Sequence, residues 1–208
     1  MKKLRIIEAL KNGFRILLEN PIIFVFAMLT YLPSLFFKMK MTKQNIPLII
    51  IYLLLKVFFI GLVIRFVYEA REKSISWQAL IKFVLSRYFL LIVTFTVYWL
   101  IVGFGLVALV IPGIILSIRL ALSDYGILLE GEGVNKSIKR SWIITKGNWW
   151  RLFVFSLIVM VPVIILSMTR SFFSKATYSV FSFLLSLFCS SWLQSSGVFV
   201  YLQLKDNQ

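Results

Sequence analysis

Six apolar stretches, each about as long as a bilayer-crossing helix, occupy most of this chain. They cover residues 21–37, 46–68, 88–110, 111–129, 149–169 and 177–204. A helix needs about 20 mostly apolar residues to cross ~30 Å of hydrocarbon. Hydrophobic residues make up 60% of the sequence, and the mean hydropathy of +0.92 leaves too little polar surface to cover a soluble globule. We therefore predict an all-α polytopic membrane protein, with residues 1–208 forming one integral membrane domain.

The number of spans depends on residues 88–129, which could form one helix or two. A single helix of that length would measure roughly 60 Å, about twice the thickness of the hydrocarbon. The sequence Ile111-Pro112-Gly113 provides a break, because proline cannot continue the helical hydrogen bonds and glycine tolerates turn geometry. We therefore predict six transmembrane helices arranged in hairpin pairs.

The basic residues are unevenly distributed between the two sides that six spans would define. The chain has 23 Lys and Arg against eight Asp and Glu, a formal net charge of +15. Fifteen basic residues lie on the side of both termini, five lie on the other side, and three lie within spans. Cytoplasmic segments are enriched in Lys and Arg, so we expect both termini to be cytoplasmic. This distribution accounts for the charge without nucleic acid, which we do not expect as a partner.

Three segments on the basic side have the pattern of amphipathic helices. Residues 4–18, 76–87 and 134–146 alternate apolar and basic positions at helical spacing, and each precedes a pair of spans. Such helices lie at a membrane surface, with basic side chains toward anionic head groups. We therefore expect three amphipathic surface helices beside the six spans. In the third, Arg140 and Trp142 are the candidate residues for contact with lipid or a partner.

The stretch from Ile111 to Phe153 carries the most specific pattern in the chain. A Pro-Gly turn opens a span with a central Arg. An acidic-glycine loop, a Ser-x-x-x-Ser-Trp helix and a Gly-Asn-aromatic-aromatic entry into the next span follow. The positions are Pro112-Gly113, Arg119, Glu130-Gly131, Ser137, Ser141-Trp142 and Gly147-Asn148-Trp149-Trp150.

This pattern resembles a family of uncharacterised six-span bacterial integral membrane proteins, related to the membrane domain of some glycerophosphodiester phosphodiesterases. The resemblance implies a multi-pass protein of the bacterial inner (plasma) membrane and carries no established activity. The chain has no histidine, and we expect no appended soluble domain, so we do not expect the phosphodiesterase activity here.

The reactive side chains are few. Without histidine the chain lacks the usual acid–base residue and most transition-metal ligands, and Cys189 is its sole cysteine. We expect no catalytic residue, no metal and no cofactor, and hence no enzyme.

Two cations near the middle of spans are the candidate binding residues. Lys56 and Arg119 fall at a similar predicted depth in the second and fourth spans. Ionisable residues inside spans are costly and frequently functional. The pair suggests a cavity for an anion such as a lipid phosphate or a carboxylate. The alternative is that both cations snorkel to the interface or are satisfied by backbone carbonyls and hydroxyls.

A second pair of charges lies nearer the basic ends of the same two spans. Arg65 and Asp124 would meet at one level, because the two spans run in the same direction. We therefore predict an Arg65–Asp124 ion pair that holds the two helices together.

These observations favour a non-enzymatic integral membrane protein that binds lipid or a partner protein in membrane or envelope processes. Membrane lipids, a protein partner or a second copy of the chain are the expected partners. The alternative is a small transporter, or the substrate-binding membrane subunit of one, for an anionic solute.

Overall fold

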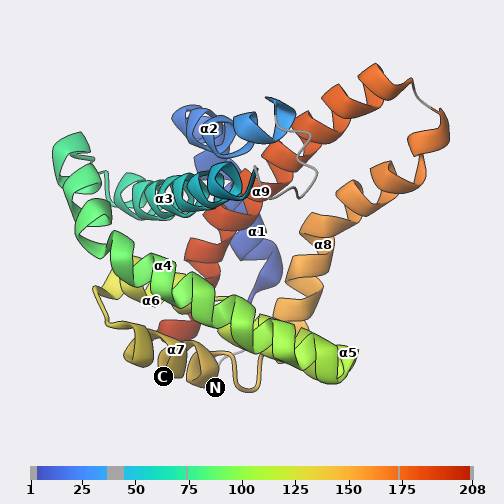
Figure 1. Ribbon diagram of the computed structural model, residues 1–208. Coiled ribbons are helices and arrows are strands. Elements are labelled where there is room, and N and C mark those ends of the chain that lie inside the picture. Colours follow the sequence, from blue (N-terminus) through green and yellow to red (C-terminus); the bar gives the residue numbers. More distant parts are fainter. Residues whose placement is uncertain (1–3, 37–44, 74, 173, 207–208) are drawn as a thin grey trace.

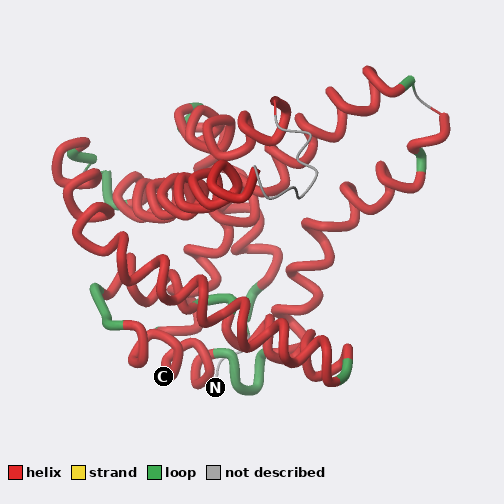
Figure 2. Tube along the Cα trace, in the orientation of Figure 1, coloured by secondary structure: helices red, strands yellow, loops and turns green. Residues whose placement is uncertain are grey.

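The computed structural model describes residues 4–36, 45–73, 75–172 and 174–206, which form helices joined by short links with no strand among them (Figure 1; Figure 2). The predicted all-α class is confirmed. In chain order the elements are α1 (Ile6–Glu19), α2 (Ile22–Phe36), α3 (Ile46–Arg71), α4 (Trp77–Ala108), α5 (Val110–Leu120), α6 (Ser123–Glu130), α7 (Val134–Ile144), α8 (Trp149–Met168), the short 3-10 helix η2 (Arg170–Phe172) and α9 (Lys175–Lys205).

Within the described residues, five helical segments are long and apolar enough to cross a bilayer: α3, α4, α5 with α6, α8 and α9. Helix α1 with the first part of α2 would make a sixth if this pair, bent by 95°, counted as one span. The bend lies at Asn20-Pro21, where proline disfavours helical geometry at the residue before it. The protein is therefore a polytopic membrane protein with five or six spans by length and composition.

One predicted boundary is absent. The amphipathic segment 76–87 and the span 88–110 were expected as two helices, but α4 is a single helix of 32 residues. No glycine or proline separates Arg87 from Tyr88, so nothing interrupts the helical hydrogen bonds there. The predicted amphipathic helix and the predicted span therefore form one continuous helix, Trp77–Ala108.

The break between the third and fourth predicted spans lies at Leu109, two residues before the predicted position. Pro112 falls in the first turn of α5, where its missing N–H costs little. A further break, absent from the prediction, separates α5 from α6 at residues 121–122.

The buried core includes residues of α1, α6, α7 and the last turns of α9, and α7 lies near both termini (Figure 1). The buried residues of α3 run from Val57 to Glu69, and those of α8 from Leu152 to Val159. Helix α9 passes through the middle of the molecule between α3 and α8, with Val198, Val200 and Tyr201 fully buried. Away from this core the hairpins separate and expose large apolar side chains, as suits contact with lipid.

Candidate functional site

A groove of about 560 Å³ opens between α3 and α4 at Lys56. Its lining is Ile50, Leu53, Leu54, Lys56, Val57, Ile92, Phe95, Thr96, Trp99 and Leu100. Lys56 is the one charged side chain in this described lining. The Lys56 ammonium lies 5.5 Å from the centre of the Tyr31 ring, at the range of a cation–π contact. The groove therefore combines apolar walls with a single cation.

Arg119 lies elsewhere, against α7. Its guanidinium carbon is 4.7 Å from the centre of the Trp142 ring, and its Nη1 donates to the Trp142 carbonyl oxygen at 3.4 Å. A backbone carbonyl and an aromatic face thus contact this cation, while its buried Nε has no hydrogen-bond partner among the described residues. Lys56 lines the groove between α3 and α4 and lies by Tyr31, whereas Arg119 lies against Trp142 of α7, so the two predicted anion-binding residues contact different parts of the molecule.

The predicted ion pair between Arg65 and Asp124 is replaced by a different one. Arg65 Nε lies 2.8 Å from Glu69 Oε1, one turn further along α3, and Nη1 donates to the Leu128 carbonyl oxygen at 3.0 Å. Residues four apart on a helix are neighbours on its surface, so Glu69 meets Arg65 without any help from tertiary packing. Arg65 still joins α3 to α6, but through a backbone oxygen.

Asp124 lines a small hollow of about 40 Å³ behind the groove. Val57 and Phe95 line both spaces, so the carboxyl side chain lies close behind the wall of the groove. Among the described residues no ion pair reaches Asp124.

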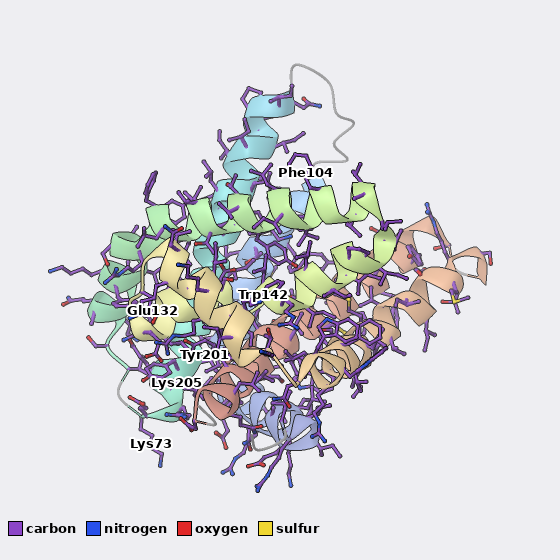
Figure 3. The ribbon with its side chains drawn as sticks, turned by 90° about the horizontal axis from the view of Figure 1, so that it is seen from below. Lys73, Phe104, Glu132, Trp142, Tyr201 and Lys205 are labelled. Carbon is purple, nitrogen blue, oxygen red and sulfur yellow. The ribbon has the colours of Figure 1, made fainter. Side chains whose placement is uncertain are left out.

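Arg140 is the centre of a charged cluster that sequence reasoning did not find. Its Nη2 lies 2.6 Å from Glu132 Oε1, and the Glu132 side chain is only 3% exposed. Lys205 pairs with Glu130 at 2.6 Å beside it, and Figure 3 shows Glu132, Tyr201 and Lys205 gathered at this end of the molecule. Burial by itself would lower the pKa of Arg140, but Tyr201, Glu132 and Glu130 outweigh that effect and raise the pKa, so the guanidinium stays charged.

Helix α7, which carries the Ser-x-x-x-Ser-Trp pattern, stabilises the break between α5 and α6. Ser141 Oγ donates to the Arg119 carbonyl oxygen at 2.7 Å and accepts the Leu122 N–H at 3.2 Å. Ser137 Oγ donates to the Ser123 carbonyl oxygen, and Gly126 provides the space for this approach. These two hydroxyls satisfy backbone groups that the break would otherwise leave unpaired. The motif recognised in the sequence therefore has a structural role.

Trp142 projects from the same helix and is 43% exposed. Beside it lies a second hollow, of about 320 Å³, between α7 and the α4–α5 hairpin. It is apolar except for Lys139. The predicted surface contacts thus divide, because Arg140 points into the charged cluster while Trp142 remains available at the surface.

The residues after Gly147 anchor the first residues described. Asn148 Oδ1 accepts the Leu4 N–H at 3.1 Å, and Arg151 Nη1 donates to the Leu4 carbonyl oxygen at 2.6 Å. Their partners lie more than 140 residues away along the chain, so no local sequence signal could have identified them.

Among the described residues, no group of three or more His, Cys, Asp or Glu side chains is placed to hold a metal ion. The chemistry that the structure offers is therefore that of cations in apolar surroundings, at Lys56 and at Arg119.

Comparison with known proteins gives a family and no activity. The profile of a family described as a domain of unknown function (DUF7847) matches residues 37–202. The UPF0259 membrane protein plu2479 of Photorhabdus laumondii is 39% identical over 85 residues, which are 41% of this chain and 29% of that protein. The match thus covers less than a third of the relative's length. No solved structure matches the chain.

Proposed function

This chain belongs to the family described as a domain of unknown function (DUF7847), and on that premise we propose that it is a non-enzymatic membrane protein that binds an acidic lipid. The observation that carries the proposal is the groove between α3 and α4, with apolar walls and Lys56 as its described charge. The walls would hold an acyl chain, and the ammonium would pair with a phosphate or carboxylate group.

Selectivity in such a groove would come from Lys56 and not from the walls. Lipid tails are as apolar as the leucine and isoleucine side chains that line the groove, so exchanging one tail for another gains little. An ammonium within a span is costly unless it is paired or reaches water. A lipid that brings an anionic group to Lys56 removes part of this cost, and a neutral lipid does not.

The proposal also includes the orientation of the chain in the membrane and its relation to other protein families. The charge distribution supports an inner-membrane protein with both termini cytoplasmic, since Lys and Arg favour that side. The pattern from Pro112 to Trp150 supports the relation to the membrane domain of some glycerophosphodiester phosphodiesterases, without their activity. The separate positions of Lys56 and Arg119 give no support to an anion transporter built around both.

The test is lipid retention by the full chain. The protein is purified into nanodiscs made from an equal mixture of phosphatidylcholine and phosphatidylglycerol, released gently, and analysed by native mass spectrometry for lipid that stays bound. The unmodified chain should retain phosphatidylglycerol at a defined stoichiometry, and Lys56→Met should lose it. Lys82→Met is the matched control, because Lys82 is exposed on α4 and lies outside the groove.

Lys56→Arg, which keeps the charge, should retain the lipid. Equal retention of phosphatidylglycerol by Lys56→Met and Lys82→Met would reject the groove as an acidic-lipid site. Retention of both lipids without preference would show that the groove is filled by bulk lipid only.

A further inference from the structure

A cavity of about 150 Å³ lies between the break that separates α5 from α6 and the helices α8 and α9. Ala121 and Leu122, the two residues of the break, line it on one side, with Tyr125 of α6 next to them. In membrane transporters, interrupted helices commonly line the sites that hold solutes. The cavity is separate from the Lys56 groove, which lies between α3 and α4.

The size of the cavity matches one aromatic ring. An engineered protein cavity of about 150 Å³, lined by Leu, Ile and Phe side chains, stays dry and binds benzene. Most of the walls are apolar here too, and they include the buried side chains of Phe155 and Val200. Among the described lining residues none carries a charge. A charged ligand would meet no counter-ion in this cavity, which is costly inside a membrane protein, so the walls suit a neutral ligand.

Three polar side chains distinguish this cavity from a purely apolar one, namely those of Tyr125, Ser156 and Gln194. Tyr125 Oη donates to the Gln194 carbonyl oxygen at 3.4 Å, and Ser156 Oγ donates to the Leu152 carbonyl oxygen at 3.0 Å. Each hydroxyl has then used its hydrogen and keeps lone pairs that accept a further hydrogen bond. The two hydroxyls therefore offer acceptors to a ligand.

Gln194 adds an acceptor that lacks a partner. Its side-chain Oε1 is buried and accepts no hydrogen bond from the described residues. A buried polar atom without a partner is destabilising, and native proteins contain few of them. The amide rotates easily about its last side-chain bond, and such a rotation would present Oε1 to a donor in the cavity. The cavity thus favours a ligand that can donate a hydrogen bond.

The position of Tyr125 is fixed by its contacts with α9. A Cβ at Gly197 would collide with Tyr125 Oη, so the glycine allows the tyrosine ring to lie against this helix. The same ring stacks on Tyr201, which Figure 3 labels, with 6.1 Å between the ring centroids. Packing between α6 and α9 therefore holds the polar side of the cavity in place.

We propose that this cavity binds a neutral molecule about the size of one aromatic ring that carries a hydroxyl group. The hydroxyl donates to one of the three acceptors, and the ring fills the apolar part. A bare hydrocarbon supplies no donor, and a carboxylate or phosphate brings a charge that the described lining does not balance. Water alone fits less well, because each buried water needs about two to four polar partners and a cavity of this volume holds several waters. The inference does not depend on the Lys56 groove.

Saturable binding of para-fluorophenol to the full chain in detergent micelles tests the inference, with fluorobenzene as the ligand that lacks the hydroxyl. Fluorine NMR separates the bound signal from that of molecules dissolved in the micelles, which does not saturate. One para-fluorophenol should bind per chain, at least about tenfold more tightly than fluorobenzene, because fluorobenzene leaves the polar groups unpaired. Lys56→Met should bind para-fluorophenol as the unmodified chain does, since Lys56 lies in the other hollow.

Two variants locate the site. Ser156→Ala and Gln194→Met each remove a polar group with little change in volume, and each should weaken para-fluorophenol binding by about five- to tenfold without affecting fluorobenzene. Ser167→Ala is the matched control, because Ser167 also donates to a backbone carbonyl of α8 but is exposed and lies outside the cavity. Thermal unfolding checks that each variant is folded.

Equal affinity of the unmodified chain for the two ligands would show a purely apolar cavity and overturn the proposal. The absence of saturable para-fluorophenol binding would overturn it as well. Equal para-fluorophenol affinities of Ser156→Ala and Ser167→Ala would place the binding outside this cavity, with the same consequence.

Discussion

Glu132 is a nearly buried carboxylate whose stability in the fold depends on its cationic neighbours. Arg140 lies 2.6 Å away and Lys136 3.4 Å away, with side chains that are 24% and 71% exposed. A buried charge without a partner is strongly destabilising, whereas an exposed ion pair contributes little. Of the two cations, Arg140 therefore contributes more to stabilising the buried charge of Glu132.

We predict that Arg140→Gln lowers the free energy of unfolding in detergent by about 2 kcal/mol, less than the ~3–5 kcal/mol typical when a fully buried pair is broken. The loss is smaller because Arg140 is partly exposed and Lys136 stays beside the carboxylate. Lys136→Gln is the control and should cost less than about 0.5 kcal/mol. Denaturant titration followed by tryptophan fluorescence measures both.

The double variant Glu132→Gln with Arg140→Gln should recover part of the loss, because it removes the unpaired buried charge. Glu132→Gln is also measured alone. If the loss of unfolding free energy in the double variant equals the sum of the losses in Glu132→Gln and Arg140→Gln, the two side chains are not coupled and this account of Glu132 is incorrect.

At the scale of whole helices, α1 and α9 approach each other closely at Gly13. A Cβ added at Gly13 would lie 2.6 Å from both Cα and N of Ser196, so backbone meets backbone and neither can yield. Small residues at helix crossings allow this distance in membrane proteins. Trp192 Nε1 donates to the Leu10 carbonyl oxygen at 2.9 Å beside the crossing and fixes the rotation of α1 on α9.

We predict that Gly13→Ala destabilises the protein by about 1–3 kcal/mol, the range for overpacking a tight contact. The matched control is Gly103→Ala in α4, where nothing lies within 4 Å of the added methyl group. Alanine has the better helix propensity, so that control should be neutral or stabilising by up to about 1 kcal/mol. Thermal unfolding in detergent compares the two, and equal midpoints would mean that α1 does not pack on α9 as described.

At the scale of the whole molecule, the two ends of the described chain are fastened to each other and to α8. Leu4 is bound by Asn148 and Arg151, and the Arg5 N–H donates to Gln203 at 3.1 Å. These contacts close loops of more than 140 residues, whose entropic cost must be met before the contacts form. The position of α1 therefore depends on long-range contacts and is not specified by local sequence.

We predict that Arg151→Gln releases the segment before α1 without unfolding the protein. Losing a hydrogen bond from a charged donor costs about 1.5 kcal/mol or more, which corresponds to roughly a tenfold rise in amide exchange. Hydrogen–deuterium exchange of the peptide that contains residues 4–10 should show this rise. Lys146→Gln, which removes an exposed charge from the link between α7 and α8, should leave the exchange rate of that peptide unchanged. Similar exchange in both variants would mean that the bond from Arg151 to Leu4 does not hold the segment.

The sequence alone predicted the all-α membrane class, helices near residues 4–18 and 134–146, and a break close to Pro112. Each of these depends on local patterns, namely apolar length, helical periodicity and the backbone limits of proline and glycine. The continuity of α4 and the break at residues 121–122 escaped prediction. The break has no glycine or proline, and the hydroxyls that stabilise it come from α7.

The same division applies to the candidate site. Lys56 and Arg119 are recognisable in the sequence as cations within apolar segments, but only the tertiary structure assigns Lys56 to a groove and Arg119 to the face of Trp142. Likewise the sequence predicted Asp124 as the partner of Arg65 and gave Arg140 no acidic partner, while the structure pairs them with Glu69 and Glu132. Hydropathy is a property of each segment and can be read along the chain. Pairing depends on how helices rotate and pack against one another, which is decided only when the whole molecule is assembled.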